Sequence, residues 1–422
     1  MPNVVEARVA SRMIAGLAAA ICTMLVTLGA VQAETSPAFR SWLATFRAEA
    51  LSAGISAATF DRVMRDIKIN RRAPDLVRPG AKRKRISNRG QAEFTRPPQA
   101  YLKASQLARL AKTGRRLARK HSTVLRQIER ELSVPASVVL AIWGRETAFG
   151  GWRLRHDAIN ALTTQAWLGR RKALFRAELI DALRMIDQAG IPRARMRSSW
   201  AGAVGLTQFM PSEYFSTAYD LDRDGTKDLW SPPDALASAA NQLKLKGWMP
   251  DRPWGIEVRI GGQVDCAMAG PQNTMPIRDW AARGLRQHNG KPFSDAALDW
   301  PAYLLVAGGT YGPVFLVTEN YVVFRRYNLS DLYALFVGDL ANRIAGRGTF
   351  RAPWADLKQV RGAELAEIQT ALKELGYGIS KIDGKLGSNT RSQIGLYQRA
   401  SGAVPDCWPT RELLAELRTK MR

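Results

Sequence analysis

The chain has 422 residues, 46% of them hydrophobic, which is enough to bury a large core and to form two or more compact units. Its 62 Lys and Arg residues against 37 Asp and Glu residues give a formal net charge of +25, which favours a polyanionic partner such as nucleic acid, anionic lipid or an acidic cell-wall polymer. The three histidines, His121, His156 and His288, are scattered without paired-ligand spacing, which argues against zinc catalysis.

The first 33 residues have the features of a secretory signal. Arg8 and Arg12 precede an apolar run that ends near the small residue Ala33, a suitable cleavage position. The run is also about long enough to span a bilayer, so an uncleaved N-terminal anchor is the alternative. We therefore expect an exported protein.

Two cysteines, Cys266 and Cys407, remain after such a cleavage. One bridge between them is compatible with an oxidising compartment. Because they lie far apart in the sequence, we expect them to be unpaired.

The first half of the chain has mainly helical periodicity. Residues 39–66 predict a helical segment whose core positions are Phe46, Ile55, Phe60 and Val63. The cationic, Pro- and Gly-containing stretch 78–90 then favours a solvated loop over a dedicated binding patch. Helical periodicity resumes at Tyr101 and continues to Pro135, a residue that suits the first turn of a further helix.

The second half combines one strand signal with further helices. Residues 255–268 alternate apolar and polar side chains, which predicts a strand in a small β-containing insertion at about 250–300. Helical patterning returns at "AYLLVAGG" (302–309) and at "SDLYALFVGDLANRIAG" (330–346). Residues 347–356 then predict a linker, and 357–422 a compact all-helical unit with a turn at Asp383–Gly384.

One carboxylate occupies an unexpected position in "VVLAIWGRETAFG" (138–150). On a helix, Glu146 shares the apolar stripe of Val139 and Trp143, and burying a bare carboxylate is costly. An apolar setting disfavours the charged form, so we expect the pKa of Glu146 to be raised, as a general acid requires. The alternative is a helix-end Glu paired with Arg145 or Arg153 on the surface.

A second motif, "SSWAGAVGLTQFMPSEY" (198–214), contains closely spaced small residues. Such residues let a ligand approach the backbone, and Gln208 offers both a donor and an acceptor for a sugar hydroxyl or N-acetyl group. A tight helix crossing with a turn at Pro211 is the alternative.

Together the two motifs resemble the lytic murein transglycosylase B family. Four further stretches (92–102, 170–183, 222–248 and 325–337) recur in the family's order, and the match covers about 36–346. The C-terminal unit resembles the small peptidoglycan-binding module of cell-wall enzymes. The matching positions there are Leu372, Leu375, Gly376, Tyr377, Asp383, Gly384, Gly387, Thr390, Arg391, Tyr397 and Gln398.

The resemblance implies a mainly α protein, with an α+β lysozyme-like catalytic domain at 34–346 followed by the all-α module at 357–422. It also implies periplasmic cleavage of the β-1,4 bond between N-acetylmuramic acid and N-acetylglucosamine without water, which forms 1,6-anhydromuramic ends. Glu146 would protonate the glycosidic oxygen and then act as a base toward the muramyl C6 hydroxyl. Ordinary glycosidases need two carboxylates, whereas the substrate's N-acetyl group can replace the nucleophile here.

The remaining family positions carry over one at a time. Ser199 and Gln208 would contact the sugar, and Phe209 and Met210 would line the cleft. Tyr327 and Asn328 match cleft residues, with Asn328 placed to orient the N-acetyl group or the acid, and we expect Tyr333 on the same helix, one turn or more further on. Each also suits a satisfied core polar residue. Two positions depart from the family. Val204 replaces the usual Met, and Gln242 stands where an aromatic residue is common, which puts one stacking contact with a sugar ring in doubt.

An acidic loop offers the one candidate metal site. Asp220, Asp222, Asp224 and Gly225 resemble the start of an EF-hand loop, in which Thr226 would also take part. The closing Glu is absent, but Asp234 would close a longer loop. The alternatives are a structural calcium ion or an acidic turn that caps its own backbone. The chemistry itself requires no cofactor.

Two other functions compete with the transglycosylase. A muramidase would need a second carboxylate roughly 5–9.5 Å from Glu146, for which Asp157 and Glu213 are the candidates. A non-catalytic wall-binding protein would have no evident use for Glu146. We expect peptidoglycan strands as partners, a loose association with the membrane or sacculus, and a monomer. Export and the lack of a reader motif argue against nucleic acid.

Overall fold

A computed structural model describes residues 36–77, 96–356, 358 and 360–421. The predicted signal segment and the stretch 78–90 lie outside these ranges. The described chain divides into two compact units. The first contains 36–77, 155–203 and 210–212, and the second contains the rest. Among the described residues, no helix combines the length and the apolar character that a membrane crossing requires.

The first unit is built mainly from helices. Ser36 and Ser56 begin the first two helices, because each side chain accepts a backbone N–H three residues later. The four predicted core residues of 39–66 are all buried. The elements of this unit are α2 (Pro37–Ser52), α3 (Ala57–Met64), β1 (His156–Asp157), α9 (Ala158–Leu168), α10 (Lys172–Asp187), η1 (Arg193–Arg195) and β2 (Arg197–Ser198).

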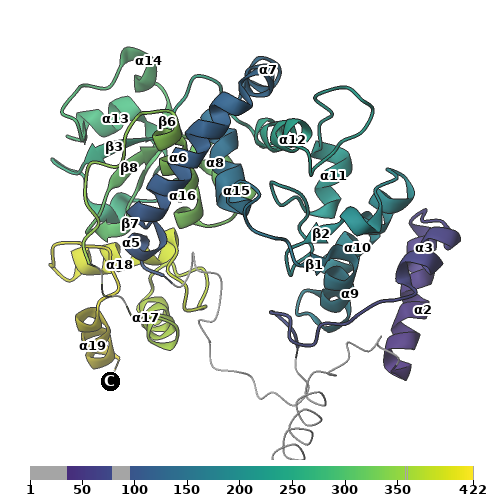
Figure 1. Ribbon diagram of the computed structural model, residues 1–422. Coiled ribbons are helices and arrows are strands. Elements are labelled where there is room, and N and C mark those ends of the chain that lie inside the picture. Colours follow the sequence, from purple (N-terminus) through teal and green to yellow (C-terminus); the bar gives the residue numbers. More distant parts are fainter. Residues whose placement is uncertain (1–35, 78–95, 357, 359, 422) are drawn as a thin grey trace, which may run out of the picture. The chain divides into compact units, whose positions relative to one another are not determined.

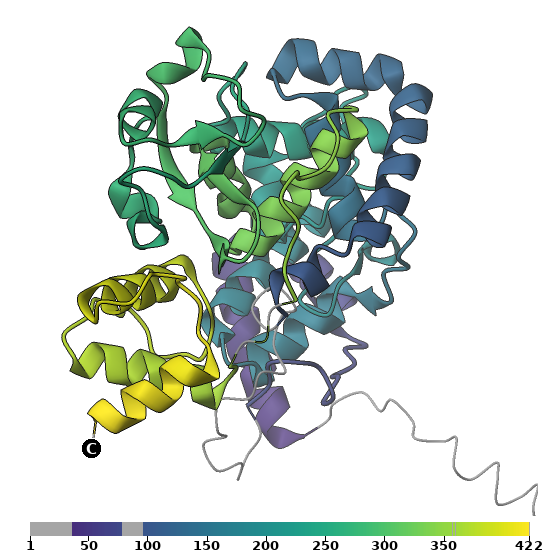
Figure 2. The same cartoon turned by 90° about the vertical axis from the view of Figure 1, so that its left-hand side faces the viewer.

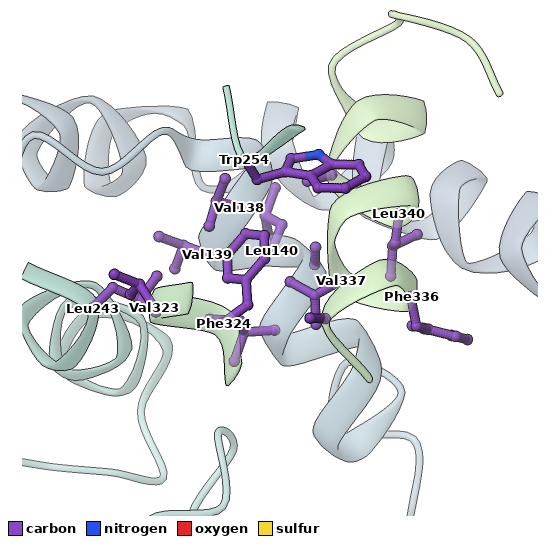
Figure 3. Packing of buried hydrophobic residues seen from close by; sticks show 14 of the residues in the cluster. Val138, Val139, Leu140, Leu243, Trp254, Val323, Phe324, Phe336, Val337 and Leu340 are labelled. Atoms are coloured by element: carbon purple, nitrogen blue, oxygen red, sulfur yellow. The ribbon is translucent and has the colours of Figure 1, made fainter. Parts of the chain in front are cut away.

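The second unit has a helical core. Its helices before the sheet are α5 (Pro98–Tyr101), α6 (Ala104–Lys120), α7 (Ser122–Leu132), α8 (Ala136–Thr147) and α12 (Pro232–Leu245), and α15 (Glu319–Tyr327) and α16 (Asp331–Ile344) follow it. The short helix α11 (Pro211–Thr217) starts in the last stretch of the first unit. Helices α6, α8 and α16 pack side by side (Figure 1). Figure 3 shows apolar side chains of α8 and α16 meeting, with Leu140 of α8 near Val337 of α16.

Close packing of α16 depends on a residue without a side chain in α8. A Cβ on Gly144 would lie 2.7 Å from the Phe149 ring and 3.1 Å from Leu340 of α16. Three successive residues after α8, beginning at the C-cap Ala148, have positive φ, so the helix ends at Thr147. Glu146 therefore lies in the last turn of a helix whose other side is buried.

A five-stranded antiparallel sheet forms the β part of the second unit. Its order is β4-β6-β8-β3-β5, so the strands of 255–317 pair out of sequence order. Its strands are β3 (Gly255–Arg259), β4 (Met275–Pro276), β5 (Arg286–Gln287), β6 (Pro301–Leu305) and β8 (Val314–Val317), and the short strand β7 (Ala307–Thr310) is not part of this order. The short helices in this region are η2 (Cys266–Met268), η3 (Pro271–Asn273), α13 (Ile277–Ala282) and α14 (Asp295–Leu298).

The structure corrects two of our expectations about this region. The segment 302–309, which we predicted as helical, forms β6 and most of β7. Its residues are buried without interruption, and a short continuous apolar run fits a strand buried on both faces as well as a helix. The predicted strand at 255–268 is confirmed only at its start, because its end forms η2 instead.

The last part of the second unit contains three helices, α17 (Ala363–Glu374), α18 (Ser388–Ala400) and α19 (Arg411–Lys420). The predicted turn at Asp383–Gly384 separates the first two helices. The third helix, α19, was not among the two that we predicted. Figure 2 shows these helices beside the strands and loops of the sheet region. Cys266 and Cys407, which we expected to be unpaired, form a disulfide with a Cα–Cα distance of 6.1 Å. The fold brings together two residues that sequence distance had separated.

Candidate active site

Glu146 is half-buried in the last turn of α8. The hydroxyl of Tyr333 donates a hydrogen bond of 2.5 Å to Oε1 of Glu146. Tyr333 lies in the first turn of α16 and not, as we expected, on the helix of Tyr327, because α15 ends at Tyr327 and a new helix begins after Ser330. The N-cap Ser330 accepts a hydrogen bond from the backbone N–H of Tyr333. A capped helix start thus places a neutral donor against the carboxylate that the sequence singled out.

Tyr333 is 1% exposed, and burial raises its pKa well above the ordinary tyrosine value. The negative charge of Glu146 raises it further. Its hydroxyl consequently stays protonated and remains a donor at any pH where such an enzyme works.

Arg145, the residue before Glu146, faces aromatic rings. Its guanidinium lies 5.3 Å from the ring centre of Tyr101, 5.5 Å from that of Tyr333 and 5.3 Å from that of Phe336, and it donates a hydrogen bond to the Tyr101 hydroxyl. These contacts place a fixed positive charge beside the Tyr333 ring.

The loop 204–209 lies against the end of α8. Thr147 donates a hydrogen bond of 2.8 Å to the carbonyl of Leu206. Val204 and Phe209 pair with each other across the loop, and a Cβ on Gly205 (φ +74°) would lie 2.6 Å from the carbonyl oxygen of Leu229. Only glycine fits that position.

Gln208 is half-buried in this loop and has a left-handed backbone (φ 57°). Its Nε2 donates to the carbonyl of Gly205 at 3.1 Å. Tyr327 closes the loop from α15 by donating a hydrogen bond of 2.7 Å to the carbonyl of Thr207. The rings of Tyr327 and Tyr333 are stacked at 6.3 Å, so the loop and the Tyr333–Glu146 pair belong to one arrangement.

Two further predicted contact residues of the second unit differ in exposure. Asn328 is half-buried at the C-cap of α15, and its side-chain amide makes no hydrogen bond within the described residues. Phe209 has no exposed surface, so it packs in the core beneath the loop. Ser199 and Met210 belong to the first unit, where the Ser199 hydroxyl accepts a hydrogen bond from the backbone N–H of Ala203.

Both candidates for a second carboxylate are engaged by cations. Lys246 donates a hydrogen bond of 3.0 Å to Oε1 of Glu213, and Gln242 donates to the same oxygen. Gln242, which stands where the family often has an aromatic residue, therefore binds a carboxylate here. Asp157 begins α9 by accepting the N–H of Asn160 and pairs with Arg193 at 2.9 Å.

The acidic loop gathers its carboxylates. Oxygens of Asp220, Asp222 and Asp224 lie within 4.8 Å of one another. Oδ1 of Asp220 is buried without a hydrogen-bond partner. Both oxygens of Asp234 accept backbone N–H groups, from Leu221 and Asp228 at 2.9 Å each.

The match to family models defines the class of protein. Residues 38–342 match the model described as a transglycosylase SLT domain, and residues 361–417 match that of a putative peptidoglycan binding domain. The chain belongs to the SLT transglycosylase family. The resemblance to lytic murein transglycosylases is confirmed.

Individual relatives agree with this assignment. The membrane-bound lytic murein transglycosylase B of Escherichia coli is 31% identical over 213 residues, 50% of this chain and 57% of that protein. The chain thus spans little more than half the length of this relative. The crystal structure of SltB3 from Pseudomonas aeruginosa in complex with NAG-anhNAM-pentapeptide has a TM-score of 0.80 and 35% identity, and covers 90% of this chain and 99% of its own.

A further related structure contains calcium. The Escherichia coli lytic transglycosylase Slt35 in complex with calcium has a TM-score of 0.52 and 26% identity, and covers 61% of this chain and 80% of its own. Together these structures confirm the predicted fold class, a mainly helical lysozyme-like protein with a small sheet and a helical C-terminal module.

Proposed function

We propose that the protein is a lytic murein transglycosylase that cleaves the β-1,4 bond between N-acetylmuramic acid and N-acetylglucosamine without water. One observation carries the proposal: Glu146 receives the neutral hydroxyl of Tyr333, whereas Glu213 is engaged by Lys246 and Gln242. A carboxylate that accepts a hydrogen bond from a neutral hydroxyl can both give and take a proton. One held by an ammonium group is a poor base or nucleophile.

In this proposal Glu146 acts twice. It first gives its proton to the glycosidic oxygen as the bond from C1 of N-acetylmuramic acid breaks. It then takes the proton of the C6 hydroxyl while O6 forms a bond to C1, which closes the 1,6-anhydro ring. No water is consumed. The N-acetyl oxygen of the substrate stabilises C1 between the two steps, so a second carboxylate is not needed.

Several contact residues flank this chemistry. The free amide of Asn328 and the half-buried amide of Gln208 are suited to hydrogen-bond the N-acetyl group or a hydroxyl. Tyr327 holds the Gln208 loop in place through Thr207. Ser199 and Met210 are proposed as further sugar contacts, and Phe209 as the apolar support beneath the loop.

The products test the proposal directly. Purified peptidoglycan is digested with the wild-type protein, and the muropeptides are identified by mass spectrometry. We expect ends of 1,6-anhydromuramic acid, a mass 18 Da below that of the hydrolysis product because one water is not added. Reducing ends would instead establish the muramidase alternative. Clearing of peptidoglycan by Glu146→Gln would overturn both enzyme functions.

The C-terminal module and the net charge suit a wall-bound enzyme. Residues 361–417 match a putative peptidoglycan binding domain, and a charge of +25 attracts an anionic glycan. We propose that the catalytic part at 34–346 and the module at 357–422, joined at 347–356, act on the wall of the periplasm after export.

We also propose that the acidic loop holds a structural calcium ion through Asp220, Asp222 and Asp224, with a backbone oxygen of Thr226 as a further ligand. The unpartnered buried oxygen of Asp220 supports this, because such an atom is costly unless a cation or donor meets it. Asp234 would brace the loop from within. Burial raises its pKa, and the charges of Asp222 and Asp220 raise it further, whereas the backbone N–H groups it accepts from lower it.

Thermal unfolding with and without calcium tests the site. At a free concentration a hundred times the dissociation constant, calcium should stabilise the wild type by about 2.7 kcal/mol. Asp222→Asn with Asp224→Asn should abolish the increase in Tm, and magnesium at the same concentration serves as the control. A Tm that calcium leaves unchanged would contradict the proposal.

A further inference from the structure

The C-terminal module, residues 361–417, is attached firmly to the rest of the second unit. The disulfide joins Cys407, between α18 and α19, to Cys266 in η2. The backbone N–H of Thr310 in β7 donates to the carbonyl of Asp406 at 3.0 Å. A Cβ on Gly395 of α18 would lie 3.0 Å from Ala267, so the helix lies directly on η2.

One contact of this interface is a buried ion pair. Nη2 of Arg391 in α18 lies 2.6 Å from Oδ2 of Asp331, and the two side chains are 5% and 9% exposed. The other oxygen of Asp331 accepts a hydrogen bond of 2.9 Å from Tyr321 and lies 3.3 Å from Nε of Arg325. Buried ion pairs often contribute little net stability, because both charges lose water. This geometry is therefore better suited to fixing a position than to stabilising the fold.

The position that it fixes is the start of α16. Asp331 is the first residue of that helix, after the N-cap Ser330. Two residues later, Tyr333 donates to Glu146. The path from the module to the carboxylate thus consists of one ion pair, one helical turn and one hydrogen bond.

We propose that Arg391 is a positioning residue for catalysis: through Asp331 it fixes the first turn of α16 and thereby the hydrogen bond from Tyr333 to Glu146. This rests on the proposed function only in so far as Glu146 performs the proton transfers. The module accordingly does more than hold the enzyme on its polymer, because it completes the support of the active site.

Kinetics on a soluble glycan tetrasaccharide with peptide stems separate this role from wall binding. Arg391→Ala should lower kcat by up to roughly tenfold, because an effect that acts through the Tyr333 hydroxyl cannot exceed the loss expected when that hydroxyl is removed. KM should change by no more than about threefold, since the sugar contacts lie elsewhere. Arg399→Ala is the matched control. Arg399 also extends from α18 to an Asp outside the module, Asp265, but that pair is exposed and distant in sequence from α16.

A double-mutant cycle with Tyr333→Phe tests the path itself. If Arg391 acts through the Tyr333 hydroxyl, Arg391→Ala should have little further effect on kcat in the Tyr333→Phe background. Arg391→Lys should recover part of the activity, because it retains the charge. Fully additive losses in the cycle would contradict the proposal, as would equal kcat values for Arg391→Ala and Arg399→Ala.

Arg391→Ala leaves Asp331 with one cation fewer in a buried setting and can unfold the chain. The double variant Arg391→Gln with Asp331→Asn removes both charges, and its thermal unfolding should stay close to that of the wild type. The same loss of kcat is expected, and a folded double variant with full kcat would overturn the inference. Reducing-end products from the wild type would overturn the proposed function instead, while the kcat comparison would still be valid.

Discussion

Two half-buried carboxylates of the second unit, Glu146 and Glu213, accept hydrogen bonds from different kinds of donor. Glu146 takes a hydrogen bond from a tyrosine hydroxyl, and Glu213 takes one from an ammonium group and one from an amide. Both carboxylates act on Tyr327: burial raises the pKa of Tyr327 most, and the negative charges of Glu146 and Glu213 raise it further. Under the proposed mechanism, the hydrogen-bond partners of the two carboxylates are what distinguish the one proposed for proton transfer from the other.

The surroundings of Glu213 also account for Gln242, which departs from the family pattern. Gln242 is 2% exposed, and its amide N–H donates a hydrogen bond to Glu213. In the family, an aromatic residue at this position would stack on a sugar ring. Lys246 lies 5.8 Å from the ring centre of Tyr327 as well. This group of residues therefore supports Tyr327, and through it the 204–209 loop.

The largest expected effect comes from exchanging each carboxylate for its amide. Glu146→Gln should lower kcat/KM by roughly 10²- to 10⁴-fold, the range of general acid–base catalysis, because the amide can neither give nor take the proton. Glu213→Gln should lower it by less than about tenfold, since only the support of Tyr327 changes. Rates of muropeptide release measure both. The two variants have the same shape change, so each controls for the other, and equal losses would show that Glu213 shares the chemistry.

The sequence predicted the parts of this arrangement that depend on local pattern. Glu146 stood out because it interrupts an apolar helical stripe, and the helix that carries Tyr333 was predicted at 330–346 from its periodicity. The partners of Glu213 were not predicted. Lys246 and Gln242 meet it only through tertiary folding, and no spacing in the chain indicates the contact.

The same limit applies to the C-terminal module. The two cysteines are separated by 141 positions, and pairing over such a distance is a property of the fold. In the sequence, Arg391 was only one of the positions that match the module. The structure shows that it is buried between Thr390 and Ser392, and a buried arginine implies an acidic partner. The sequence could not say that the partner is Asp331, 60 residues earlier.

A smaller effect than that of Glu146→Gln is expected at Tyr333, and it is the sharpest test of the comparison because it removes only a hydrogen-bond donor to Glu146. Tyr333→Phe keeps the ring and its stacking on Tyr327 but loses the hydroxyl. We expect kcat to fall roughly tenfold, since a hydrogen bond to a charged group is worth about 1.5–3 kcal/mol when fully formed. KM should be nearly unchanged.

The pH–rate profile of Tyr333→Phe shows in which direction the Tyr333 hydroxyl shifts the pKa of Glu146. The pKa of Tyr333 is raised by burial and by the Glu146 charge, so its hydroxyl does not ionise in the working range and cannot itself produce a limb of the profile. Its hydrogen bond favours the ionised carboxylate, so losing it should move the limb that reports Glu146 to higher pH. Tyr327→Phe, which loses only the bond to the carbonyl of Thr207, should change KM and leave that limb in place. A limb that stays in place in Tyr333→Phe would mean that Tyr333 only packs against the carboxylate, and the contrast with Glu213 would then need another cause.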